Sequence, residues 1–216
     1  MKKKKNKKPF YYFIYDFVKA TAAVPGLVFY RPKYYYPGGK KRIHGGALVI
    51  SNHISFADPI LVMLGIWYRR HHFICMREFY ESRLTGWLFD RFHCIPIDRE
   101  NMNIGSFRNI IECLKEDKMV SMFPEGHVNF DEETLEKFKS GMVLMALLSK
   151  KPIVPMYIEK RKNILGRLKI CIGEPFDVTA PFGERPSVPE MDQIAEMLHE
   201  REEELKDYIM KRKEVL

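Results

Sequence analysis

The feature of this chain that most limits its fold is a regular alternation of short apolar runs with amphipathic helical runs. Short apolar runs are typical of buried strands, whereas residues 104–117 carry one apolar stripe at helical spacing. The expected strands are residues 47–51, 72–76, 94–97, 119–123, 153–158 and 168–172, and the expected helices are residues 59–68, 80–91, 104–117 and 141–149. Such alternation predicts an α/β fold with a mixed, largely parallel sheet flanked by helices.

The chain is predicted to have two parts. Residues 1–33 form a basic tail followed by an interfacial or membrane-anchoring helix, or a short helical hairpin. Residues 34–216 form the α/β domain, which ends in a charged surface helix over residues 191–213. A chain of 216 residues suits one domain with a sizeable core. The four cysteines lie far apart without a Cys-x-x-Cys motif, which indicates reduced, buried thiols in a cytosolic environment.

The positive charge of the chain is concentrated at its beginning. The formal net charge is +8, and six of these charges come from lysines between positions 2 and 8. The rest of the chain is therefore close to neutral, with a net charge of +2. A short basic tail does not form a nucleic-acid-binding face, so we expect no nucleic-acid partner.

The segment after the lysines, residues 9–30, is aromatic and apolar, and its length approaches the roughly 20 residues of a membrane span. Asp16 and Lys19 interrupt it and can pair on one side, while Pro25 is expected to break the helix. The opposite side carries apolar residues at helical spacing, namely Phe10, Phe13, Ile14, Phe17 and Val18. Aromatic residues beside a lysine cluster suit the headgroup zone of an anionic bilayer. We therefore predict a peripheral or monotopic protein at the cytoplasmic face of the cell membrane. A single span, a signal peptide and a soluble packed helix are the alternatives.

A histidine and an aspartate, His53 and Asp58, stand five residues apart directly after the first expected strand. Open α/β sheets usually keep their chemistry at the carboxyl ends of strands. His53 could accept a proton near neutral pH, and Asp58 could orient its ring. Because no Gly-x-Ser-x-Gly elbow or reactive-cysteine signature accompanies the pair, the substrate would supply the attacking hydroxyl. Asp58 followed by Pro59 is also a good helix start, and capping is compatible with orienting a histidine.

Three further polar blocks follow later in the chain. They are Ile95-Pro96-Ile97-Asp98-Arg99, Phe123-Pro124-Glu125-Gly126-His127, and Phe138-Lys139-Ser140-Gly141 leading into Pro152-Ile153-Val154-Pro155. Together with the His53/Asp58 block, their order and content resemble the four blocks of the glycerolipid acyltransferase family over about residues 40 to 175. The bacterial lysophosphatidate (1-acylglycerol-3-phosphate) acyltransferases are the members that look most similar. Four blocks in order form a far more specific signal than one short motif.

The resemblance implies transfer of a fatty acyl group from acyl-CoA or acyl-carrier protein to the free hydroxyl of 1-acylglycerol-3-phosphate. The product would be phosphatidic acid, a step of phospholipid biosynthesis, made without a covalent acyl-enzyme, a metal or another cofactor. On this resemblance His53 would be the general base and Asp58 its orienting partner. Arg99 would help to hold the acceptor phosphate, while Glu125 and Gly126 would organise the acceptor pocket.

Two positions depart from the pattern that these acyltransferases usually show. Val128 stands where the third block usually has an arginine that grips phosphate, and His93 stands where the second block usually opens with glycine. Arg77 or Arg99 could supply the missing charge, since arginine binds phosphate through two parallel hydrogen bonds. Another lysophospholipid or lipid-alcohol acceptor is the first alternative. A catalytically silent lipid-binding relative is the second.

Overall fold

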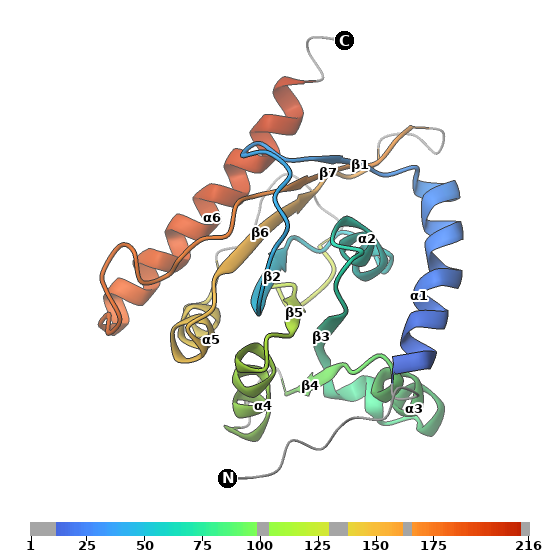
Figure 1. Cartoon of the computed structure of the whole chain (residues 1–216), viewed down its shortest axis with the longest axis horizontal. Helices are drawn as coiled ribbons and strands as arrows, with labels where there is room; N and C mark the ends of the chain where they lie inside the picture. Colours follow the sequence, from blue (N-terminus) through green and yellow to red (C-terminus); the bar gives the residue numbers. More distant parts are fainter. Residues whose placement is uncertain (1–11, 99–103, 130–137, 162–165, 213–216) are drawn as a thin grey trace.

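A seven-stranded sheet with the strand order β1-β7-β6-β2-β5-β3-β4 forms the centre of the protein (Figure 1). In the computed structural model, residues 12–98, 104–129, 138–161 and 166–212 are described. The strands are β1 (Lys33–Tyr35), β2 (Ala47–Ser51), β3 (His71–Met76), β4 (Ile95–Ile97), β5 (Met119–Met122), β6 (Ile153–Ile158) and β7 (Lys169–Ile172). Every neighbouring pair is parallel except β6 and β7, which are antiparallel. The predicted mixed, largely parallel sheet is therefore confirmed.

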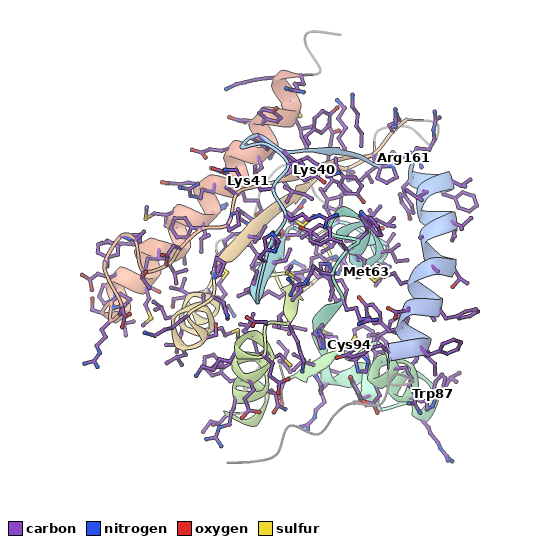
Figure 2. The ribbon with its side chains drawn as sticks, in the orientation of Figure 1. Lys40, Lys41, Met63, Trp87, Cys94 and Arg161 are labelled. Carbon is purple, nitrogen blue, oxygen red and sulfur yellow. The ribbon has the colours of Figure 1, made fainter. Side chains whose placement is uncertain are left out.

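Helices cover both faces of the sheet, and their side chains fill the space on either side of it (Figure 2). They are α1 (Phe13–Pro25), α2 (Asp58–Gly65), α3 (Arg83–Arg91), α4 (Ile104–Lys115), α5 (Gly141–Ser149) and α6 (Val188–Lys211), with the π-helical turn η2 (Gly26–Tyr30) and the 3-10 turn η3 (Arg77–Tyr80). In β2, Val49 packs in the core cluster that contains Leu61 of α2, while Leu48 packs with Val143 of α5 on the other face. Burial on both faces explains why β2 is a continuous apolar run.

Strand β1 and the start of α6 differ from the sequence predictions. Tyr34 and Tyr35 lie outside the expected strands, but they form the sheet edge by pairing in parallel with β7, far along the chain. Helix α6 begins at Val188, three residues earlier than predicted. There the Glu190 carboxylate accepts the backbone N–H and the hydroxyl of Ser187, at 2.6 and 2.7 Å. This Ser-x-x-Glu capping box fixes the helix start.

The expectation that Pro25 breaks the N-terminal helix is wrong. The chain continues through Pro25 into the π-helical turn η2, so residues 13–30 form one helical segment. The Pro25 dihedral angles are helical, and the backbone N–H of Gly26 bonds to the carbonyls of Ala22 and Ala23. Proline has no N–H group to donate within the helix. The wider π-helical turn that follows lets the chain continue as a helix past this missing hydrogen bond. In the described part of the chain, residues 13–30 are the one helix long and apolar enough to cross a membrane, by length and composition alone.

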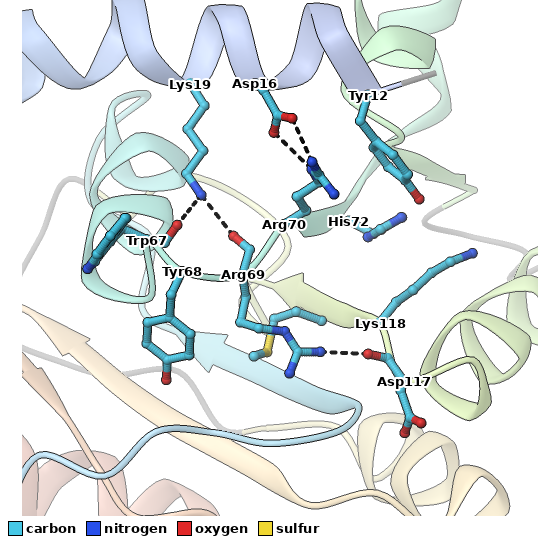
Figure 3. Close-up of a pocket in the computed structure, with 11 residues that line it drawn as sticks. Tyr12, Asp16, Lys19, Trp67, Tyr68, Arg69, Arg70, His72, Asp117 and Lys118 are labelled. Atoms are coloured by element: carbon cyan, nitrogen blue, oxygen red, sulfur yellow. Dashed lines mark hydrogen bonds and ion pairs between the residues drawn. The ribbon is translucent and has the colours of Figure 1, made fainter. Parts of the chain in front are cut away.

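Helix α1 turns its polar side chains toward the α/β domain (Figure 3). The Tyr15 hydroxyl accepts the backbone N–H of His71 at 2.8 Å, and the Lys19 ammonium donates to the backbone carbonyls of Trp67 and Arg69. Asp16 accepts two hydrogen bonds from Arg70, at 2.8 and 2.6 Å. The predicted Asp16–Lys19 pair is thus replaced by tertiary contacts. The paired guanidinium and, to a smaller extent, nearby Lys19 hold the pKa of Asp16 below its ordinary value.

The opposite side of this helical segment is apolar and exposed. Its residues are more than half exposed at six positions, namely Phe13, Phe17, Val24, Leu27, Val28 and Phe29. On the domain side, Gly26 packs so closely that a Cβ there would lie 3.1 Å from the Leu64 side chain and 3.2 Å from that of Ile60. The helix therefore presents its small and polar side to the protein and its large apolar side to the surroundings. The division of the chain after residue 33 stays a prediction.

Helix α6 brings one buried carboxyl group, Glu202, beneath the end of β2. Glu202 is 0% exposed, and its Oε1 atom accepts the backbone N–H of Asn52 at 2.8 Å. Burial, and secondly the nearby Glu125 carboxylate, raise the pKa of Glu202 well above its ordinary value of 4.5. The hydrogen bond from Asn52 acts in the opposite direction but does not outweigh burial. Glu202 is therefore protonated in the folded protein at a pH where it is ionised in the unfolded chain.

This pKa shift predicts how stability changes with pH. Below about pH 4.5 both states hold the proton, and above it the unfolded chain loses the proton first, so the stability of the wild type falls as pH rises. Glu202→Gln cannot ionise and should gain unfolding free energy relative to the wild type between pH 5 and pH 8. Urea unfolding at both pH values measures this difference. The matched control is Glu204→Gln, which changes an exposed carboxylate on the same helix. A difference from the wild type that is the same at pH 5 and pH 8 for both variants would contradict the assignment.

Candidate active site

The end of β2 is fixed by the side chain of Asn52. Its Nδ2 donates to the carbonyl of Ile158 at 2.9 Å, and its Oδ1 accepts the backbone N–H of Ile158 at 2.8 Å. With its own backbone N–H bonded to Glu202, Asn52 ties β2 to the end of β6 and to α6. Asn52 is 1% exposed, so all these hydrogen bonds are shielded from water. The loop that starts at His53 therefore leaves the sheet from a rigid point.

Asp58 organises that loop through one carboxylate oxygen. Its Oδ2 atom accepts hydrogen bonds from the His53 Nδ1 at 2.8 Å and from the backbone N–H groups of Ile54 and Ser55, each at 2.7 Å. Asp58 is 0% exposed and is the first residue of α2, where the helix dipole favours a negative charge. The N-cap position is held by Ala57. The carboxylate thus binds the loop and the histidine rather than capping the helix.

His53 is held in one orientation and stays accessible. Its side chain is 16% exposed, and its ring stacks on Phe123 with a centroid distance of 4.1 Å and an interplanar angle of 16°. Its backbone carbonyl accepts the N–H of Asn129 at 2.6 Å. Because a carboxylate can only accept a hydrogen bond, Nδ1 carries the proton in this pair. The Nε2 atom is then the ring nitrogen that can accept a proton from a bound molecule.

The third block, Phe123 to His127, directly follows β5, the strand next to β2. Gly126 adopts a φ of +73°, a left-handed conformation that strains other residues, and its N–H closes a turn onto the Phe123 carbonyl at 3.0 Å. Glu125 is 7% exposed and lies near enough to Glu202 to raise the pKa of that carboxyl group. The first and third blocks therefore meet at one edge of the sheet.

Of the two arginines predicted to bind phosphate, the structure describes Arg77. Arg77 is exposed at the start of η3, directly after β3, which is two strands away from β2 at the same sheet edge. Arg99 lies outside the described residues. Val128 is partly buried in the loop that bonds to His53. The roles predicted for Arg77, Arg99, Glu125 and Gly126 stay predictions.

His93 and the two histidines of β3 have structural surroundings. His93 has a φ of +55°, so it occupies the left-handed conformation that a glycine adopts without strain. His71 is fully buried, and its Nδ1 lies 2.7 Å from the Ser121 hydroxyl. Burial lowers the pKa of His71 to about 3, so its ring is neutral. His72 is also buried. His71 and His72 are therefore buried structural residues.

Three residues at this site were not singled out from the sequence. Phe123 supplies the surface on which His53 stacks, Asn52 fixes the strand end, and Glu202 binds the backbone of Asn52. Phe123 opens the third block and Asn52 directly precedes His53, so the blocks themselves were the available signal. Glu202 lies 150 residues from Asn52 in a charged helix, where no local pattern distinguishes it from its exposed neighbours.

A separate cavity of about 460 Å³ lies under α1, among residues that include Lys19, Arg70 and Asp117 (Figure 3). It also touches His72 and Met119, which stand at the beginnings of β3 and β5. His53 lies at the opposite, carboxyl edge of the sheet. The cavity contains none of the site residues predicted from the sequence.

Comparison with known proteins agrees with the four sequence blocks. A sequence model of the acyltransferase family matches residues 32–159. The 1-acyl-sn-glycerol-3-phosphate acyltransferase of Bacillus subtilis (strain 168) is 29% identical over 167 residues, which are 75% of this chain and 82% of that protein. The protein of the same name from Limnanthes alba is 34% identical over 125 residues, 56% of this chain and 43% of its own length.

The fold has a match among solved structures. It is the crystal structure of the 1-acyl-sn-glycerophosphate (LPA) acyltransferase PlsC from Thermotoga maritima, which matches with a TM-score of 0.61 and 22% identity. The match covers 88% of this chain and 80% of that one. It supports the fold, and the family match independently spans more than half of the sequence. This chain therefore belongs to the acyltransferase family.

Proposed function

We propose that this protein transfers a fatty acyl group from acyl-CoA or acyl-carrier protein to the free hydroxyl of 1-acylglycerol-3-phosphate. The product is phosphatidic acid. The observation that carries the proposal is the His53–Asp58 pair, which is hydrogen-bonded at 2.8 Å and leaves Nε2 for a substrate. The names of the Bacillus and Limnanthes relatives support the choice of acceptor. Phe56, 79% exposed between the two residues, offers apolar surface to an acyl chain.

The proposed reaction is a single displacement. His53 Nε2 takes the proton of the acceptor hydroxyl as its oxygen attacks the thioester carbonyl carbon. The tetrahedral intermediate collapses and the carbon–sulfur bond breaks. The leaving thiolate then takes the proton from the imidazolium of His53, which restores the neutral ring. Asp58 keeps the ring in the required tautomer and stabilises its positive charge. Binding both substrates in one site supplies the rest of the rate enhancement, because the entropy cost of bringing them together is met on binding.

We also propose that the protein works on the cytoplasmic surface of the cell membrane, where its lipid acceptor resides. The exposed apolar stripe of residues 13–30, with its polar contacts turned inward, supports this location. The lysines that precede α1 in the sequence would face anionic headgroups, each worth roughly 1 kcal/mol near such a surface. This arrangement is that of an interfacial helix lying on one leaflet.

Val128 favours a second candidate, an acyltransferase for another lysophospholipid or a lipid alcohol. An aliphatic side chain cannot donate a hydrogen bond to a phosphate oxygen. Either another residue supplies the positive charge that pairs with the acceptor phosphate, or the acceptor has no phosphate. Thiol release from palmitoyl-CoA and from palmitoyl-carrier protein, measured with a panel of lysolipids, tests both candidates. We expect lysophosphatidate to give kcat/KM at least about tenfold above lysophosphatidylcholine and lysophosphatidylglycerol. Its phosphate monoester offers a guanidinium more charge and one more terminal oxygen than their phosphodiesters, and a charge-assisted hydrogen bond is worth about 1.5 kcal/mol or more. Equal values would favour the second candidate, and acceptor-independent release would indicate a thioesterase.

His53→Ala removes the proposed base and should lower kcat by about 10²- to 10⁴-fold, the usual contribution of a general base. The variant should keep a cooperative unfolding transition, because the ring is partly exposed at the surface. His44→Ala is the matched control, since His44 is exposed before β2 at the other edge of the sheet. Wild-type turnover in His53→Ala would refute the base assignment.

Asp58→Asn tests the orienting role separately. The amide places an N–H group where the carboxylate accepts three hydrogen bonds, so His53 loses the interaction that fixes its tautomer. We expect kcat to fall by about 10²- to 10⁴-fold, as when a triad aspartate is replaced by its amide. The control Asp177→Asn changes a carboxylate that bonds to Thr179 at the surface. If both variants keep wild-type kcat, Asp58 has a structural role alone.

A further inference from the structure

Helix α3 has an apolar face that the described part of the chain leaves exposed. Leu84 is 75% exposed, Trp87 49% and Leu88 37%, and their spacing of three and four residues places them on one side of the helix. The other side is held by Phe89, whose ring stacks on that of Phe79 at 5.1 Å. Figure 2 shows Trp87 at the outer rim of the molecule, away from the sheet. The exposed face is therefore rigidly presented.

Helix α3 ends beside the start of α1. The residues directly after α3 touch the start of α1, because the ring of His93 lies 4.6 Å from that of Tyr12 and the ring of Phe92 lies 6.3 Å from that of Tyr15. Figure 1 likewise shows α3 at the foot of α1. The outward stripe of α1 begins with Phe13, next to these contacts. Two helices from separate parts of the sequence, each with an exposed apolar face, thus adjoin.

Arginines stand at both ends of this face. Arg83 and Arg91 are exposed at the two ends of α3, while the exposed carboxylates of Glu78 and Glu81 precede the helix and that of Asp90 lies within it. The guanidinium of Arg91 lies 5.5 Å from the centre of the Trp87 ring. Tryptophan and arginine side by side are typical of the zone where lipid headgroups meet acyl chains. A face with leucines at its centre and arginines at its ends matches a bilayer better than a polar protein surface.

We propose that Leu84, Trp87 and Leu88 form a second contact with the anionic bilayer, inserted beside α1. This inference rests on the proposed function, which places the protein on a membrane. One inserted helix leaves a domain free to rotate about that helix, whereas two adjoining elements fix its orientation. Since α3 follows the carboxyl end of β3 through η3, the second contact ties the catalytic edge of the sheet to the membrane surface.

The chain contains two tryptophans, Trp67 and Trp87, and this allows a direct test. Trp67→Phe leaves Trp87 as the sole reporter on α3. Trp87→Phe leaves Trp67 as the matched control, because its ring is also exposed, at 64%, while its carbonyl accepts Lys19 on the domain side of α1. Both variants are mixed with vesicles of phosphatidylglycerol and phosphatidylcholine that carry brominated acyl chains. We expect Trp87 emission to shift to the blue and to be quenched, and Trp67 emission to change little.

Two outcomes of this measurement would overturn the proposal. One is unquenched Trp87 in protein that co-sediments with the vesicles, which would mean that α1 anchors the protein alone. The other is a blue shift of Trp87 without lipid together with a dimer in analytical ultracentrifugation, which would mean that a second copy covers this face. Acyl transfer to lysophosphatidate in detergent micelles is assayed in parallel. That activity tests the proposed function independently of vesicle contact.

A pair of substitutions tests the energetic contribution of the same face. Leu84→Gln with Leu88→Gln keeps helix propensity and changes only exposed side chains, so the fold should persist. Losing the burial of two leucines should weaken binding to anionic vesicles by about tenfold or more. Leu148→Gln is the matched control, because Leu148 is a 48% exposed leucine on α5. Equal vesicle affinity of the double variant and the control would refute the second contact.

Discussion

The active-site loop depends on one buried carboxylate oxygen. Asp58 Oδ2 accepts the ring N–H of His53 and two consecutive backbone N–H groups, and the side chain is fully buried. A buried carboxylate is costly unless donors surround it, so the loop must take the path that supplies them. The same atom therefore fixes the backbone of the loop and the orientation of the imidazole. The four residues between His53 and Asp58 give the chain just enough length to make this turn.

The parallel sheet brings the other supports of the loop together. Strand β2 lies between β5 and β6, so the carboxyl ends of all three strands meet at one edge. From β5 come the ring of Phe123 and, after a turn, the N–H of Asn129. From the end of β6 come both hydrogen bonds to Asn52, to which α6 adds Glu202. Residues from three distant segments thus support the loop that carries His53.

Local sequence patterns predicted most helices and strands, but they did not predict the contacts between distant segments. The sequence predicted all strands except β1, with β2 and β6 correct at both ends, because a buried strand is an apolar run regardless of its partner. Strand β1 has three residues, and it pairs with β7, which lies far along the chain. Asp16 was predicted to pair with Lys19 on its own helix. Asp16 pairs with Arg70 instead. Two parallel hydrogen bonds stabilise this pair by more than the few tenths of a kcal/mol that an ion pair within one helix typically provides.

The orientation of α1 shows why an apolar stripe alone does not reveal where a helix belongs. The stripe of Phe13 and Phe17 would fit a protein core or a bilayer equally well by its spacing. The polar residues decide between them, because Tyr15, Asp16 and Lys19 all bond to the segment from Trp67 to His71. A helix fastened by its polar side must leave its apolar side outward. Contiguous apolar surface of this kind on a protein indicates a site of interaction. The inward hydrogen bonds are thus the physical reason for the outward apolar face.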